Sequence, residues 1–175
     1  MMNARFFLAA ALCLSAATGA LAQGAAKPTL VGTFNDWQMW TYNGTWGTGE
    51  AKICFVYAEP EKMQPTRLDH GRVSFAITVT PGEDASPEAN FVVGYALKEQ
   101  SSVTVDIGGR AFTMFTQGDS AWLVDKADEP ELLAAMKKGR TMVIKATSRR
   151  GNSTTYNYSL RGITAATDKM QAECK

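Results

Sequence analysis

Hydrophobic and polar residues alternate along most of this chain, and this two-residue period is typical of strands that bury one face. The period is clearest over 72–80, where every second residue is a large apolar one, and it recurs over 91–97 and 103–107. Further strands are expected over 33–40, 52–58, 110–116, 121–124, 141–147 and 154–161. The pattern therefore predicts about nine short strands.

Two segments carry a helical pattern instead. The first begins at Asp128, a capping residue with Glu131 three positions later, and it ends before Gly139. The second covers 164–172 and would carry Cys174 toward the early strands. Many strands with few helices predict a mainly β fold, a single-domain antiparallel β-sandwich or barrel-like sheet with one short internal helix and a C-terminal helix.

Residues 1–22 have the features of a secretory signal peptide. Arg5 precedes an apolar run over 6–14, and Ala20-Leu21-Ala22 supplies the small residues that a cleavage site needs. The run is too short to stay in a bilayer as a helix, which takes about 20 apolar residues, and no later segment is long enough. We therefore expect a mature chain without a transmembrane segment, located in the periplasm or secreted after cleavage near Ala22.

An alternative processing route would attach a lipid to Cys13, as in bacterial lipoproteins. Leu12 disfavours this route, because it stands where a small residue is needed. On the preferred route, residues 23–29 form a flexible leader and residues 30–175 form one β domain with its own core.

Cleavage at that position leaves two cysteines, Cys54 and Cys174. Thiols that can meet outside the cytoplasm are usually oxidised, so we expect these two to form a disulfide. A bridge between residues so far apart stabilises the fold by up to about 5 kcal/mol in the chain-entropy model. The alternative is that Cys174 pairs with a partner molecule.

Charge gives little guidance to a partner over the whole molecule. Removal of Arg5 with the signal peptide leaves 17 basic and 17 acidic residues, so no long-range attraction to nucleic acid is expected. Several basic residues nevertheless follow the predicted internal helix, among them Arg149 and Arg150 in a turn. These two are candidates for binding phosphorylated head groups or another acidic envelope component, and the alternative is that they are ordinary solvent-facing charges.

Aromatic residues are dense between positions 34 and 46. Trp37 fits a core position, whereas Tyr42 and Trp46 flank Asn43-Gly44 and are candidates for an exposed surface that stacks on a sugar or on a partner's side chain. The alternative is that both pack inside the protein.

Catalytic groups are scarce. The single histidine, His70, lies in the turn-like Asp69-His70-Gly71, where we expect an exposed side chain, and no serine has the context of a nucleophile. The acidic residues lack the spacing of zinc or calcium motifs. We therefore predict no catalytic residue, no metal and no cofactor. An exported hydrolase whose carboxylates converge only in the folded protein remains an alternative.

A series of short motifs along the mature chain resembles the invasion-associated locus B family, small secreted or periplasmic proteins of Gram-negative bacteria. The motifs are Phe34-x-x-Trp37, Cys54 followed by Pro60, Gly71-x-Val73-x-Phe75, Gly94-Tyr95-x-Leu97-Lys98, Ala121-Trp122, Ala135-Met136-Lys137-x-Gly139, residues 148–154, Tyr158-Ser159-Leu160-x-Gly162 and Cys174. Many relatives carry another cysteine shortly after the first tryptophan, and this chain does not, so the resemblance implies one disulfide here.

The resemblance implies a non-catalytic envelope protein, in a family named for an association with entry into host cells. We accordingly expect an exported module that binds a protein or an envelope component, as a monomer or weak oligomer, with a role in host-cell interaction. A periplasmic folding or stress factor that holds unfolded proteins is a further alternative.

Overall fold

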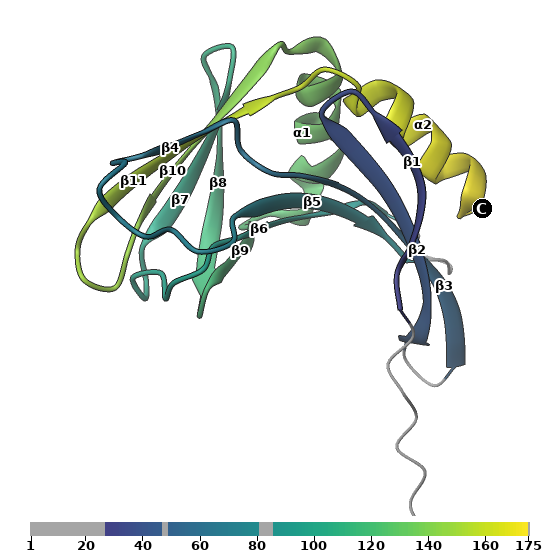
Figure 1. Cartoon of the computed structure of the whole chain (residues 1–175), viewed down its shortest axis with the longest axis horizontal. Coiled ribbons are helices and arrows are strands. Elements are labelled where there is room, and N and C mark those ends of the chain that lie inside the picture. Colours follow the sequence, from purple (N-terminus) through teal and green to yellow (C-terminus); the bar gives the residue numbers. More distant parts are fainter. Residues whose placement is uncertain (1–26, 47–48, 81–85, 175) are drawn as a thin grey trace, which may run out of the picture.

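The computed structural model describes residues 27–46, 49–80 and 86–174, which form one antiparallel sheet with two helices (Figure 1). The predicted mainly β fold is thus confirmed. Its strand order is β1-β2-β3-β5-β6-β9-β8-β7-β10-β11-β4. The strands are β1 (Thr29–Phe34), β2 (Trp37–Trp46), β3 (Gly49–Ala58), β4 (Lys62–Gln64), β5 (Ser74–Val79), β6 (Glu88–Val92), β7 (Ser102–Ile107), β8 (Arg110–Gln117), β9 (Ser120–Leu123), β10 (Thr141–Thr147) and β11 (Ser153–Ser159).

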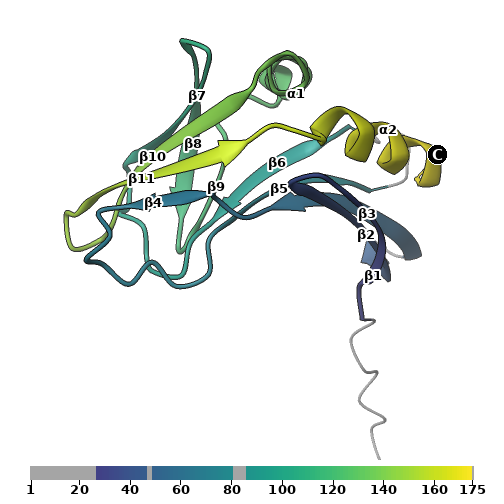
Figure 2. The same ribbon diagram turned by 45° about the horizontal axis from the view of Figure 1, so that its top comes forward.

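The sheet bends strongly between its two ends (Figures 1 and 2). Strands β1, β2 and β3 lie at one end, β4, β10 and β11 lie at the other, and β5 and β6 arch between them. The helices α1 (Glu129–Lys138) and α2 (Ile163–Glu173) lie above the arch of β5 and β6 in Figure 1, with α2 beside β1. The predicted signal peptide and most of the predicted leader fall outside the described residues.

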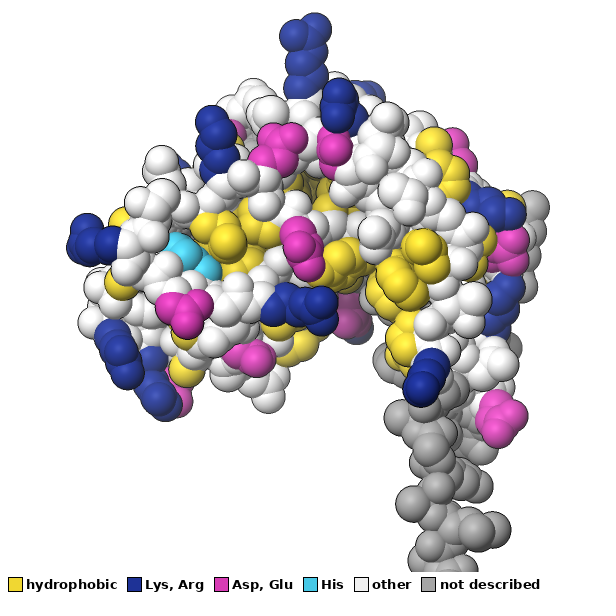
Figure 3. All heavy atoms as spheres, in the orientation of Figure 1, with side chains coloured by type: hydrophobic (Ala, Val, Ile, Leu, Met, Phe, Trp, Pro, Cys, Tyr) yellow, Lys and Arg dark blue, Asp and Glu magenta, His cyan; other side chains and the backbone are white. Residues whose placement is uncertain are grey.

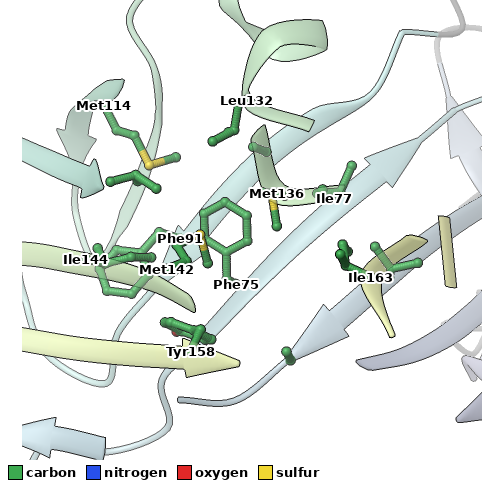
Figure 4. Packing of buried hydrophobic residues seen from close by; sticks show 14 of the residues in the cluster. Phe75, Ile77, Phe91, Met114, Leu132, Met136, Met142, Ile144, Tyr158 and Ile163 are labelled. Atoms are coloured by element: carbon green, nitrogen blue, oxygen red, sulfur yellow. The ribbon is translucent and has the colours of Figure 1, made fainter. Parts of the chain in front are cut away.

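The core lies between the bent sheet and the two helices. Helix α1 directs Leu132 and Met136 toward Phe75 and Phe91 of the arch, as Figure 4 shows. Trp37, which the sequence placed in the core, is fully buried. The alternation of the strands therefore buries one face, as expected.

Two departures from the predicted elements have local causes. The single strand expected over 33–40 is a hairpin, because Asn35 adopts a positive φ of 51° and starts a turn between β1 and β2. The internal helix is present, but Asp128 makes no capping hydrogen bond. Its backbone is already helical, and Asp125 instead accepts a hydrogen bond from the N–H of Ala127 at the start of a 3-10 turn.

The C-terminal helix α2 packs against β1, β2 and β3 and ends beside β3. There the predicted disulfide between Cys54 and Cys174 is formed, with a Cα–Cα distance of 6.1 Å across 120 residues of chain. Next to it, Lys52 forms an ion pair with Glu173 at 2.9 Å. In the described part of the chain, no helix is long and apolar enough to cross a membrane.

Among the described residues, one carboxyl group is buried. Glu129, at the start of α1, is 6% exposed, and both of its carboxylate oxygens lie 3.0 Å from the backbone N–H of Ala89 on β6. Burial raises the pKa of the Glu129 carboxyl from 4.5 to about 7, and the nearby Glu88 adds to the rise, although the Ala89 N–H favours the charged form. Folding therefore favours the protonated form of this group.

Loss of the disulfide should destabilise the protein strongly. Replacement of both Cys54 and Cys174 by serine is expected to lower the free energy of unfolding by about 3 to 5 kcal/mol, because the denatured chain regains the freedom that a long closed loop removes. Urea titration followed by circular dichroism measures this difference. An unchanged midpoint would contradict the structural role of the bridge.

Glu129 should make stability depend on pH. Because its pKa is higher in the folded state, its contribution is complete below pH 4.5 and is lost as the pH rises toward 7. The expected loss is on the order of 2 kcal/mol, allowing for partial access of water. Glu129→Gln should flatten this slope, whereas Glu99→Gln, an exposed control, should keep it. Urea titrations at a series of pH values would refute the assignment if the two variants behaved alike.

Candidate functional site

A polar pocket of about 320 Å³ lies at the end of the molecule that carries β11. Three segments form it: the loop that follows β4, the irregular segment that follows β6, and the β10–β11 turn with the start of β11. The lining residues are Leu68, Asp69, His70, Tyr95, Ala96, Ser148, Arg149, Arg150, Asn152 and Thr154. The described pocket therefore includes Arg149 and Arg150, two of the residues that the sequence singled out for binding.

Two glycines bring the first two segments together. A Cβ atom at Gly94 would lie 2.5 Å from the Cα of Gly71, so the backbones can approach only because neither residue has a side chain. The N–H of Gly94 donates a hydrogen bond to the carbonyl of His70 at 3.0 Å. This contact explains why the strand predicted over 91–97 is wrong: β6 covers Glu88–Val92, and the chain then leaves the sheet.

The floor of the pocket is a continuous line of hydrogen-bonded side chains. The Tyr95 hydroxyl lies 2.7 Å from that of Thr154 and 2.6 Å from that of Tyr156. The Tyr156 hydroxyl lies 2.9 Å from Nδ1 of His70, and Nε2 of His70 lies 3.1 Å from the carbonyl oxygen of Pro65. Tyr95, Tyr156 and His70 therefore each have two hydrogen-bond partners, and the line ends at the Pro65 carbonyl.

The direction of these bonds follows from the acceptor at one end. The Pro65 carbonyl only accepts, so Nε2 of His70 carries the proton and donates to it. In the neutral ring Nδ1 then accepts from Tyr156, which in turn accepts from Tyr95. Both ring nitrogens are occupied by the protein, so the ring offers no free nitrogen to remove a proton from a substrate.

The expectation that His70 is an exposed turn residue is wrong. His70 is only 5% exposed. Its ring packs edge to face against the ring of Tyr156, with 5.4 Å between the ring centroids. The local sequence does read as a turn, and Gly71 does adopt a positive φ of 59°. The turn points inward because Gly94 holds it against the end of β6, a contact between residues far apart in sequence.

The two arginines project from a turn that several hydrogen bonds hold in place. The N–H of Arg149 donates to the carbonyl of Ala96 at 2.8 Å, and Ser148 and Asn152 exchange hydrogen bonds across the turn. Both arginine side chains are exposed, and within the described residues neither guanidinium forms an ion pair. Figure 3 shows basic side chains around this end of the molecule. The backbone here is held by hydrogen bonds, and the two guanidiniums have no ion-pair partner among the described residues.

The other two predicted binding residues lie elsewhere. Tyr42 is half-buried on β2 and meets Phe55 of β3 edge to face, with ring centroids 6.2 Å apart. Trp46 ends β2, and its side chain lies outside the described residues. Strand β2 and the β10–β11 turn lie at opposite ends of the molecule in Figures 1 and 2, so the four candidates do not form one surface.

A metal site has no support in the described residues, because they contain no group of three or more histidine, cysteine, aspartate or glutamate side chains that could hold an ion. The pocket itself contains one carboxylate, Asp69, which accepts a hydrogen bond from the N–H of Gly71 at 2.9 Å. Its other polar groups are hydroxyls, an amide, an imidazole and two guanidiniums. This set suits recognition of a polar or anionic ligand.

Removal of one hydroxyl from the pocket floor should be costly. Tyr156→Phe leaves Nδ1 of His70 and one bond of Tyr95 unsatisfied, so the free energy of unfolding should fall by about 1 to 3 kcal/mol. Tyr158→Phe is a matched control on the same strand, because the Tyr158 hydroxyl is buried without a hydrogen-bond partner. Denaturant titration of both variants checks the prediction. An equal loss in the two would mean that the line of bonds contributes nothing specific.

Comparison with known proteins places the chain in a family. The family model described as invasion associated locus B (IalB) protein matches residues 40–171. Among solved structures, the crystal structure of invasion associated protein B from Bartonella henselae is similar, with a TM-score of 0.57 and 16% identity over 81% of this chain and 96% of that chain. At that identity the likeness shows the fold alone, and no curated protein matches the sequence. By the extent of the family match, the chain belongs to the invasion associated locus B family.

Proposed function

We propose that this protein is an exported, non-catalytic binding module of the bacterial envelope, and that its polar pocket binds an acidic envelope component. The observation that carries the proposal is the pair Arg149 and Arg150, two guanidiniums without ion-pair partners among the described residues, beside a floor of hydrogen-bonded hydroxyls. Guanidinium groups bind phosphate and carboxylate through two parallel hydrogen bonds. A phosphorylated head group or an acidic protein surface would satisfy them.

The lack of a catalytic arrangement in the pocket supports the non-catalytic part of the proposal. His70 uses both ring nitrogens within the protein, and Thr154, at 2% exposure, is tied to Tyr95. Neither group is placed to attack a substrate or to activate a nucleophile. Binding is therefore the activity that this geometry supports best.

Export is supported by the signal-like first 22 residues and by the disulfide, since stable disulfides are typical of oxidising compartments. The structural neighbour from Bartonella is described as an invasion associated protein. We extend that association to this chain as part of the proposal: the bound component would lie in the envelope or on a host cell. Cell fractionation with mass measurement of the mature protein tests both the compartment and cleavage near Ala22.

Loss of the two arginines should weaken binding to acidic surfaces. The double variant Arg149→Ala/Arg150→Ala is expected to bind vesicles of phosphatidylglycerol and phosphatidylcholine at least about tenfold more weakly than the unchanged protein, because each basic residue near an anionic surface contributes about 1 kcal/mol. Vesicle co-sedimentation at low and physiological salt provides the measurement. Binding should also weaken as salt rises.

Lys138→Ala/Arg140→Ala is the matched control, because it removes the same charge from exposed positions at the end of α1. This variant should retain most of the binding. If both double variants lost affinity equally, attraction would depend on total charge and the pocket would not be the site. If neither lost affinity, or if the unchanged protein ignored acidic vesicles and acidic proteins alike, the proposal would fail.

A further inference from the structure

A second cavity lies over the face of β1, β2 and β3 that points away from the core, and it extends to Glu61 and Arg72. Side chains alternate along these strands: Met39 and Val56 are fully buried, whereas Trp40 and Phe55 point to the other face. The cavity holds about 570 Å³, a volume typical of small-molecule sites. Its lining includes the aromatic residues Trp40, Phe55 and Tyr57 and the charged residues Asp36, Glu59, Glu61 and Arg72.

Strand register sets three aromatic rings beside one another in this cavity. Trp40 is directly opposite Phe55, and Gln38 is directly opposite Tyr57, two residues further along. Direct and diagonal neighbours across antiparallel strands lie within reach of aromatic side chains. All three aromatic residues are half-buried, and Figure 3 shows hydrophobic side chains on this face, with charged side chains near them. The result is an apolar floor bordered by polar groups.

The polar atoms of two of these rings are already bonded within the protein. Nε1 of Trp40 donates to the side-chain oxygen of Gln38 at 3.1 Å, and the Tyr57 hydroxyl donates to Glu59 at 2.5 Å. A ligand is therefore offered the faces of fixed rings rather than their hydrogen-bonding edges. Stacking on such faces suits a flat, weakly polar surface such as the C–H face of a sugar ring.

Charges around the cavity are of both signs and largely compensate. Asp36 accepts hydrogen bonds from Arg161 and Ser159, which hold the pKa of its carboxyl below the ordinary value. Arg72 lies 3.9 Å from Glu59, and both side chains are mostly exposed. An anionic ligand would meet Glu59 and Glu61, and a cationic one would meet Arg72. A neutral ligand avoids both repulsions.

We propose that this cavity is a binding site for a neutral oligosaccharide. Sugar hydroxyls both donate and accept hydrogen bonds, so they can use the Glu59 and Glu61 carboxylates and the Arg72 guanidinium together. The C–H faces of the same sugar stack on Trp40 and its two aromatic neighbours. This site shares no lining residue with the arginine pocket. The inference is therefore independent of the function proposed for the arginine pocket.

Titration of the full mature protein with neutral trisaccharides tests the inference. Maltotriose, mannotriose and chitotriose are the probes, and tryptophan fluorescence with calorimetry is the readout. At least one probe is expected to bind, and Trp40→Ala should weaken that binding about tenfold through loss of the stacking surface. Tyr57→Phe keeps its ring and should change the affinity by no more than about threefold, since it loses one hydroxyl that Glu59 already occupies.

Controls separate this site from the arginine pocket and from misfolding. Arg149→Ala/Arg150→Ala should bind the trisaccharide as the unchanged protein does. Trp40 is half-buried, so its replacement should lower the urea midpoint, and circular dichroism on the same sample shows whether the variant is still folded under the binding conditions. The inference is overturned if none of the three probes binds at millimolar concentration, if Trp40→Ala binds as well as the unchanged protein, or if an arginine-rich peptide binds the cavity in place of the sugars.

Discussion

The contact between Gly71 and Gly94 determines the architecture of one end of this protein. It lets two backbone segments touch where any side chain would separate them, and a hydrogen bond between Gly94 and His70 fixes their relative position. From this contact follow the early end of β6, the burial of His70 and the position of Tyr95 over β11. The pocket thus depends on backbone packing, because the contact between Gly71 and Gly94 positions the side chains that line it.

Much of the fold could be predicted because it depends on local patterns. The two-residue period identified the strands of the core, and the helical segment ending before Gly139 matched α1 closely. Gly139 is also required by packing, because a Cβ atom there would lie 2.6 Å from the side chain of Ile107. The disulfide was predicted from the number of cysteines and the expected compartment, and the helix beside β3 completes it.

What could not be predicted depends on contacts between distant segments. His70 looked exposed because its neighbours form a turn, and nothing local indicates that Tyr156, 86 residues away, covers it. Similarly, the aromatic-rich stretch gave no sign of which rings point outward until the register of β2 against β3 was known. Tyr42 was selected, whereas Trp40, next to it on the same outward face, lines the larger cavity.

The two cavities differ in chemistry as well as position. One carries unpaired guanidiniums over hydroxyls, and the other carries aromatic faces between carboxylates and a single guanidinium. The two are neighbours in the chain at one point, since Arg72 lines one cavity and His70 lines the other.

The bridge from β3 to the end of α2 also dictates an order of events during synthesis. A polypeptide emerges from its N-terminus, so the thiol of Cys54 appears with β3, and its partner follows only after β4 to β11 and α2. Until Cys174 has appeared, Cys54 cannot form the bridge of the folded protein. Closure of the bridge consequently requires that α2 has been made and lies beside β3, and free thiol would report the fraction of chains in which this contact has not formed.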